Sequence, residues 1–227
     1  MSRSSLTSLV AASATAAVIA LGAVACGPAD DTGSAAPSGS DGSTASAPAK
    51  QQDKKPADKP AEKAAFKGSG TYQVGSDVQP GTYRTTGNDD GMCYWERSKD
   101  AKGDTDSILA NDNVTGSSYV TIKKTDKFFK STDCKDWFAV TATKSGTPKT
   151  KVSGDGMYKV GTDIAPGTYK STGNADGMCY WERSKDALHG MESITANDNV
   201  TGTAIVTVAK SDAYFKSQGC DDWRKTG

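Results

Sequence analysis

The sequence has little histidine and no excess of positive charge. Its 227 residues contain one histidine, His189, and 27 basic side chains against 27 acidic ones. Binding to nucleic acid needs a basic surface for the phosphates, so nucleic acid is not an expected partner. No stretch has the period of a helix of useful length. These absences favour a β protein that does not depend on imidazole chemistry.

A tandem duplication organises the chain. Nine residues, CYWERSKDA, begin at Cys93 and return unchanged at Cys179, an offset of 86 residues (93 to 179). This offset aligns residues 70–137 with 156–223 without a gap, so the structural unit is one small module in two copies. The lone histidine aligns with Gly103 of the first copy. Catalysis by imidazole is therefore available to one copy only.

The cysteines indicate an oxidising compartment. Of five cysteines, two lie in each copy: Cys93 and Cys134 in the first, Cys179 and Cys220 in the second. Four cysteines allow three pairings. Duplication selects Cys93–Cys134 and Cys179–Cys220, because each copy must be a closed unit. A module of about 70 residues buries a small core, and the disulfide is its expected covalent support.

The fifth cysteine, Cys26, follows a segment typical of an export signal. Residues 1–25 begin with a positive charge and continue as an apolar run rich in alanine. Their end resembles a bacterial lipobox, although Ala23 stands where that pattern prefers leucine. The resemblance implies a lipoprotein that carries palmitate on Cys26 and is anchored at the extracellular face of the cell membrane. The alternative is a secreted protein with a free thiol.

Composition divides the rest of the chain. Residues 26–68 form the lipidated start and a tether of Ala, Pro, Ser, Gly, Asp and Lys, which is expected to be disordered. The first β module is expected at 69–141, a linker at 142–154 and the second β module at 155–227.

Each module reads as a series of short strands separated by turns. In the first copy we expect strands at 72–75, 82–86, 92–97, 107–110 and 118–124, with turns at 87–91 and 111–116 rich in Gly, Asn and Asp. Such spacing predicts an all-β fold of two tandem, small, antiparallel sandwiches or barrels, each with one disulfide.

The repeated peptide contains the candidate binding residues. Alternation along a strand places Trp95 on the face of the neighbouring cysteine, where it is expected to pack against the disulfide. Tyr94 and Glu96, with Tyr180 and Glu182 in the second copy, then lie on the opposite face. There they are possible binding residues on an aromatic surface of the kind found in sugar-binding modules.

The sequence gives little support for metal binding or for hydrolysis by acidic residues. The segment 111–113 resembles calcium ligands, but turn chemistry explains its Asn and Asp residues better, so no metal and no cofactor is expected. Acidic pairs such as Glu96 with Asp100, or Asp104 with Asp106, suit hydrolysis only if they line a cleft. No catalytic residue is predicted.

Four short motifs resemble an uncharacterised module of secreted proteins and lipoproteins in high-GC Gram-positive bacteria. They occupy 74–84 (VGxDVxPGTYR), 93–97 (CYWER), 110–113 (ANDN) and 129–137 (FKSxxCxxW), and all recur in the second copy. The resemblance implies an extracellular location and a β fold, and it assigns no activity.

Together these features predict a cell-surface lipoprotein that displays two non-catalytic modules for binding or envelope association. Its expected partners are the membrane, through the lipid, and a cell-wall polymer or an extracellular protein. The alternatives are a hydrolase that acts on wall polysaccharide through acidic residues, and a structural or inhibitor protein.

Overall fold

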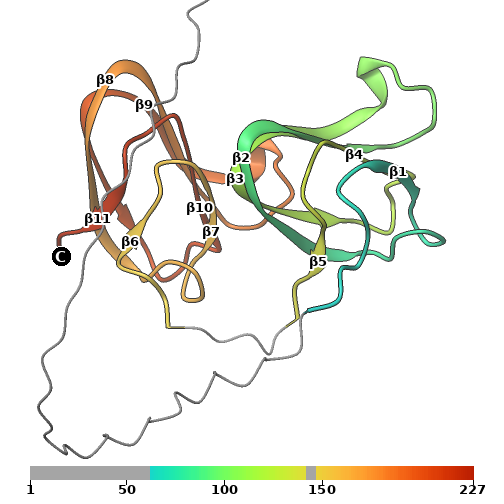
Figure 1. Cartoon of the computed structure of the whole chain (residues 1–227), viewed down its shortest axis with the longest axis horizontal. Helices are drawn as coiled ribbons and strands as arrows, with labels where there is room; N and C mark the ends of the chain where they lie inside the picture. The colour runs from blue at the N-terminus through green and yellow to red at the C-terminus, as the bar shows by residue number, and fades with distance from the viewer. Residues whose placement is uncertain (1–61, 142–146) are drawn as a thin grey trace, which may run out of the picture. The chain divides into compact units, whose positions relative to one another are not determined.

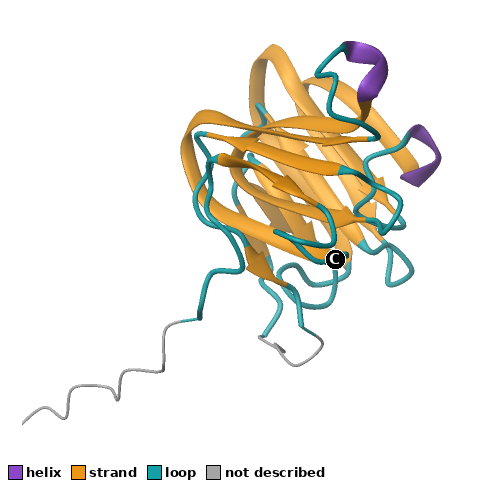
Figure 2. Ribbon diagram, turned by 90° about the vertical axis from the view of Figure 1, so that its right-hand side faces the viewer, coloured by secondary structure: helices purple, strands orange, loops and turns teal. Residues whose placement is uncertain are grey.

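A computed structural model describes residues 62–141 and 147–227, which belong to one compact unit. This part of the chain is all-β, and its helical segments are two short 3₁₀ turns, η1 (Thr105–Ser107) and η2 (Met191–Ser193), shown in purple in Figure 2. None of its helices is long or apolar enough to cross a bilayer. The predicted export signal, Cys26 and most of the tether lie outside the described residues.

The first module, residues 62–141, is one antiparallel sheet (Figure 1). Its strands are β1 (Gly70–Gln73), β2 (Gly81–Ser98), β3 (Ile108–Ile122), β4 (Phe128–Thr132) and β5 (Phe138–Ala139). They are ordered β1-β4-β2-β3, and β5 pairs with the first half of β2.

The second module, residues 147–227, repeats this arrangement. Its strands are β6 (Lys151–Val152), β7 (Gly156–Lys159), β8 (Gly167–Ser184), β9 (Ile194–Val208), β10 (Tyr214–Gln218) and β11 (Trp223–Lys225). The order is β6-β11-β8-β10-β7, with β9 on the other side of β8. The predicted all-β fold of two tandem antiparallel modules, each with one disulfide, is therefore confirmed.

Two long bent strands replace the four short strands predicted in the middle of each module. The predicted turn at 87–91 lies inside β2, and the one at 111–116 lies inside β3. The register between β2 and β3 shifts on both sides of Asn88, where Gly87 and Gly91 have φ of 81° and 67°. Glycine tolerates such angles, so these residues form bulges that bend the pair without ending it. The bend lets both halves of the sheet contribute to one core.

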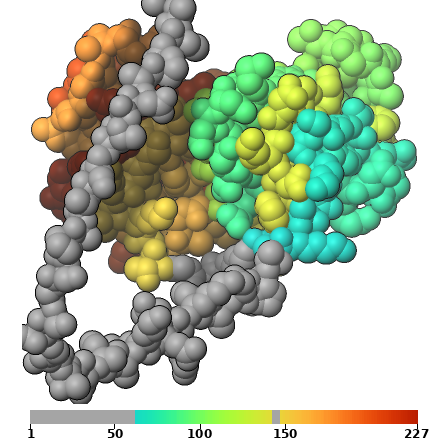
Figure 3. Space-filling view, in the orientation of Figure 1, coloured from blue at the N-terminus to red at the C-terminus, as the bar shows by residue number. Residues whose placement is uncertain are grey.

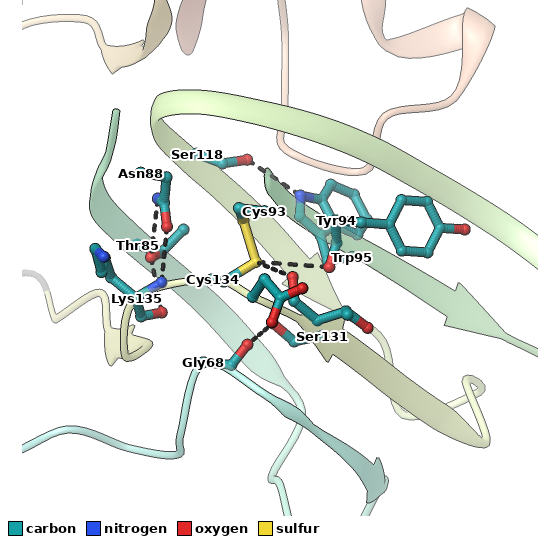
Figure 4. Close-up of a disulfide and its surroundings, with 12 residues drawn as sticks. Gly68, Thr85, Asn88, Cys93, Tyr94, Trp95, Ser118, Ser131, Cys134 and Lys135 are labelled. Atoms are coloured by element: carbon teal, nitrogen blue, oxygen red, sulfur yellow. Dashed lines mark hydrogen bonds between the residues drawn. A yellow bond between two sulfur atoms is a disulfide. The ribbon is translucent and has the colours of Figure 1, made fainter. Parts of the chain in front are cut away.

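Asn88, read from sequence as a turn residue, is buried at this bend. Its amide nitrogen donates to the carbonyl of Gly116, and its amide oxygen accepts from the backbone N–H of Lys135 (2.7 Å). The side chain therefore joins the bent hairpin to the segment after β4 (Figure 4). Its counterpart Asn174 makes the equivalent bonds in the second module.

The disulfides lie beside buried tryptophans, as the sequence predicts. Cys93 is bonded to Cys134 and Cys179 to Cys220, each closing a separation of 41 residues. In the first module Cys93, Trp95 and Trp137 belong to one hydrophobic cluster, in which neither tryptophan is exposed. Figure 4 shows Trp95 beside the Cys93–Cys134 disulfide.

Packing extends both modules upstream of their predicted starts. Phe66, from the segment assigned to the tether, is buried against Trp137 and pairs with it through an isolated bridge. Val152, from the predicted linker, is buried in the second module and pairs with Trp223. Figure 3 shows the start of the first module (cyan) against the segment that contains β4 and β5 (yellow).

Candidate functional site

The predicted pair Tyr94 and Glu96 lies on β2, on the face opposite the core. Both side chains are half-buried, and the Tyr94 hydroxyl donates to the Glu96 carboxylate over 2.6 Å. The amide of Asn111 donates to the same hydroxyl over 3.3 Å. Burial, followed by the bond to Glu96, raises the pKa of Tyr94. The Tyr94 hydroxyl is therefore held by Glu96 and Asn111, and a role of this pair in binding stays a prediction.

The equivalent pair in the second module is more enclosed. Tyr180 donates to Glu182 over the same 2.6 Å, and Glu182 is buried. Burial raises the pKa of Tyr180. On the neighbouring strand Lys216 reaches across to Asp112 of the first module, with an Nζ–Oδ1 distance of 2.7 Å. This pair therefore lies close to the contact between the modules.

That contact is centred on Tyr119 of β3. The residue is 4% exposed, and its hydroxyl donates to the Asp163 carboxylate of the second module over 2.6 Å. Its ring centroid lies 5.1 Å from that of Tyr214. Burial raises the pKa of Tyr119, and it raises that of Tyr214 to about 12. With Met157 and Ala187, these rings form a hydrophobic cluster shared by the two modules.

Two hydrogen bonds to backbone carbonyls of the second module continue the contact along β3. The Ser117 hydroxyl donates to the carbonyl of Met157 over 2.9 Å, and the Thr121 N–H donates to the carbonyl of Ala187 over 2.8 Å. β3 is an edge strand of its sheet, and such bonds protect an exposed edge.

The loop after β8 covers the end of the first module. The ring of His189 lies edge-on to Trp95, with centroids 4.7 Å apart, and its Nε2 is 2.7 Å from the carbonyl oxygen of Tyr119. Because a carbonyl only accepts, Nε2 carries the proton and Nδ1 is an acceptor. Burial lowers the pKa of His189. Arg97, paired with Asp126, also donates to the loop carbonyl of Leu188.

A groove lies where the modules meet. Its volume is about 660 Å³, and both modules contribute to its lining. We call it the junction groove; the side chains used below are Arg84, Tyr119, Lys149, Lys151, Tyr158, Asp163 and Asp222. Lys151 is paired with Asp222, and Arg84 with Glu62. Aromatic side chains together with a few charged groups are common in ligand-binding clefts.

Sequence reasoning missed this groove and the contact beside it. The available signal was divergence between the copies: Tyr119 aligns with Ile205, and His189 with Gly103. The predicted binding residues Tyr94, Glu96 and Tyr180 do not line the groove. Within residues 62–141 and 147–227, no three His, Cys, Asp or Glu side chains converge on a position that could hold a metal ion.

Comparisons with known proteins identify the module. A family model described as the Rv1352-like extracellular domain matches residues 64–138 and again 150–224. The uncharacterized proteins Rv1352 of Mycobacterium tuberculosis and Mb1387 of Mycobacterium bovis are each 29% identical to the chain over 84 residues. These alignments cover 32% of this chain and 68% of each relative. No solved structure matches the chain.

Proposed function

Because the chain belongs to the Rv1352-like extracellular domain family, we propose that it is a non-catalytic surface lipoprotein that binds an envelope polysaccharide in the junction groove. The observation that carries this proposal is a groove of about 660 Å³ that both modules line. A ligand in the groove contacts both modules at once, so the two modules form a single binding site.

The chemistry of the groove favours a hydroxyl-rich polymer that carries acidic groups. Lys149 supplies donors and positive charge, and Arg84 and Lys151 add N–H donors although they are already paired with Glu62 and Asp222. Tyr158 supplies an aromatic wall, and its hydroxyl is held by the carbonyl of Asp155 (2.6 Å). Guanidinium and ammonium groups donate to carboxylates and hydroxyls, while tyrosine rings cover the apolar faces of a sugar.

Lys149 provides the sharpest test of this site. Its counterpart at the same repeat position, Lys63, is also exposed and does not line the groove. We expect Lys149→Glu to weaken retention of the full chain on purified acidic wall polysaccharide, and Lys63→Glu to leave it unchanged. Co-sedimentation with insoluble wall material at several salt concentrations measures this, because a charged contact weakens with salt.

Two results would contradict the proposal. Equal retention of both variants would show that the polysaccharide does not bind in the junction groove. Shortening of the polymer during incubation would favour the alternative of a hydrolase that uses acidic residues.

The lipid anchor on Cys26 completes the proposed function. Cys26 lies outside the described residues, so the support is the resemblance of residues 23–26 to a lipobox. We expect Cys26→Ala to move the protein from the membrane fraction to the medium or to leave it unprocessed. Unchanged membrane fractionation of this variant would contradict the lipid anchor, and it would not bear on the proposed binding in the junction groove.

A further inference from the structure

A second, smaller cavity lies beside the loop that follows β8. Its volume is about 110 Å³, and its lining includes the polar side chains of Glu182, Ser184, Asp186, His189, Ser193 and Lys216. We call it the loop pocket. It shares none of its lining residues with the junction groove. A ligand here is therefore separate from the polysaccharide proposed above.

Two buried hydroxyls in the loop pocket have no protein partner. Ser184 is 2% exposed and Ser193 is 1% exposed, and neither Oγ makes a hydrogen bond. Buried polar groups are nearly always paired, so two unpaired hydroxyls in one polar cavity indicate an occupant.

The first module shows a paired counterpart of one of these hydroxyls. There Ser107, the counterpart of Ser193, has its hydroxyl 2.6 Å from carboxylate oxygens of both Asp100 and Asp104. The second module has Gly190 where the first has Asp104. The replacement removes one of the two carboxylates, and the retained one, Asp186, makes no hydrogen bond with Ser193.

The charged side chains that line the loop pocket indicate which kind of ligand it binds. Glu182 and Asp186 provide two carboxylates, whereas the lining cation, Lys216, is already paired with Asp112 over 2.7 Å. His189 is bonded to the Tyr119 carbonyl through Nε2 and offers an acceptor at Nδ1. The pocket thus presents acceptors and negative charge to whatever fills it.

We propose that the loop pocket binds a primary ammonium group. An ammonium group has three N–H donors and one positive charge, which match two carboxylates and two hydroxyls in a small space. A volume of about 110 Å³ admits a small amine or the amine end of a larger ligand. Free amines and the lysine side chain of a peptide share this chemistry.

The test titrates the full oxidised chain with ethanolamine and, in a second arm, with a lysine-containing tripeptide, followed by calorimetry and NMR. Binding of ethanolamine is the expected result, and binding of the peptide alone would assign the pocket to a polymer-borne amine. Ethylene glycol has the same size without the charge, and we expect it not to bind. Equal binding of ethylene glycol, or binding of neither amine, would overturn the proposal in favour of ordered water.

The duplication supplies a matched control. Asp186→Asn keeps the shape of the side chain and an acceptor for the backbone N–H of Leu188, but removes the charge. We expect it to weaken amine binding by about tenfold or more, the usual effect of losing one charged hydrogen bond. Asp100→Asn, at the same position of the first module, should leave the affinity unchanged. Equal loss in both variants would contradict the site, while Ser193→Ala gives an independent check within the pocket.

Discussion

The same nine-residue peptide lies in two different environments in the two modules. Trp95 is not exposed, and its indole N–H lies 3.3 Å from the hydroxyl of Ser118, to which it donates, under the edge of His189. Trp181, at the same position of the second module, is half-buried and its N–H has no partner, because Ala204 replaces Ser118. The comparison shows that the second module covers the surface around Trp95, whereas the equivalent surface around Trp181 is not covered by the first module.

The edge strands show the same asymmetry. Tyr119 on β3 is 4% exposed beneath the second module, whereas its counterpart Ile205 on β9 is 64% exposed. The covering residues also differ between copies, since Met157 aligns with Thr71 and Leu188 with Lys102. A contact between unlike surfaces of like modules is heterologous and in principle repeats without end. Here the first module has polar residues in place of Met157 and Leu188, which disfavours a second contact of the same kind.

The largest expected effect tests whether the modules are equally dependent on their disulfides. Each bridge closes the same separation of 41 residues. Loop-closure entropy then predicts a loss of about 4 kcal/mol in unfolding free energy when either pair is changed to alanine. Denaturant unfolding of Cys93→Ala/Cys134→Ala and of Cys179→Ala/Cys220→Ala measures both. A much smaller loss for one pair would show that its module draws stability from the other.

The Arg–Asp pairs sharpen the comparison. Arg97 and Asp126 have side chains 5% and 1% exposed, while Arg183, paired with Asp212, is 24% exposed. Removing one partner of a buried pair leaves the other charge buried and unpaired. We therefore expect Asp126→Ala to lower the free energy of unfolding by roughly 3 kcal/mol and Asp212→Ala to lower it clearly less. Chemical denaturation of the two variants measures both losses. The reverse order would mean that the cover over Arg97 does not persist in solution.

A residue swap tests the contact itself. Tyr119→Ile removes the bond to Asp163 and the ring contact with Tyr214, and we expect it to cost roughly 2 kcal/mol. The mirror change, Ile205→Tyr, alters an exposed position and should have almost no effect. Thermal unfolding of the two variants compares them directly. Equal effects would show that the two edge strands are alike in solution.

The smallest expected effect concerns pH. Burial lowers the pKa of His189 from its ordinary value of 6.5, and Asp112, Glu182 and Lys216 are the charges that face it. The folded chain therefore binds fewer protons than the unfolded chain below pH 6.5, so stability is retained above that pH and falls as the pH drops. A single proton changes the unfolding free energy by at most about 1.4 kcal/mol per pH unit, which bounds the loss between pH 6.5 and pH 5.5.

His189→Gly is the matched control, because it restores the residue of the first copy at a position with φ of 59°. We expect this part of the pH dependence to disappear in melting curves of the variant. An unchanged dependence would assign the effect to other groups.

Independent folding of the second module stays a prediction. Val152 of β6 is buried and pairs with Trp223, and the Ser217 hydroxyl donates to the carbonyl of Gly154. A fragment that begins at residue 150 keeps these contacts, and one that begins at 155 loses them. The longer fragment is the suitable one for testing whether the module unfolds cooperatively alone.

Local sequence and the duplication determined much of this protein. They were enough to predict the β class, the disulfide pairing and the face of β2 on which Trp95 lies, because alternation and repeat symmetry act within one module. They misassigned the segments at 87–91 and 111–116 as turns. Glycine and asparagine suit a turn and a bulge equally, and the choice depends on whether a partner strand continues beyond them.

Only the tertiary structure decided what surrounds each copy. Tyr119 and Asp163, or Trp95 and His189, meet because one module rests on the other, and no local pattern encodes that placement. Both candidate sites depend on it: the junction groove has walls from both modules, and the loop pocket lies where the second copy departs from the first. Trp95 and Arg97 are buried in the first copy, whereas Trp181 and Arg183 at the same places of the identical peptide are half-buried, because burial depends on neighbours that are distant in sequence.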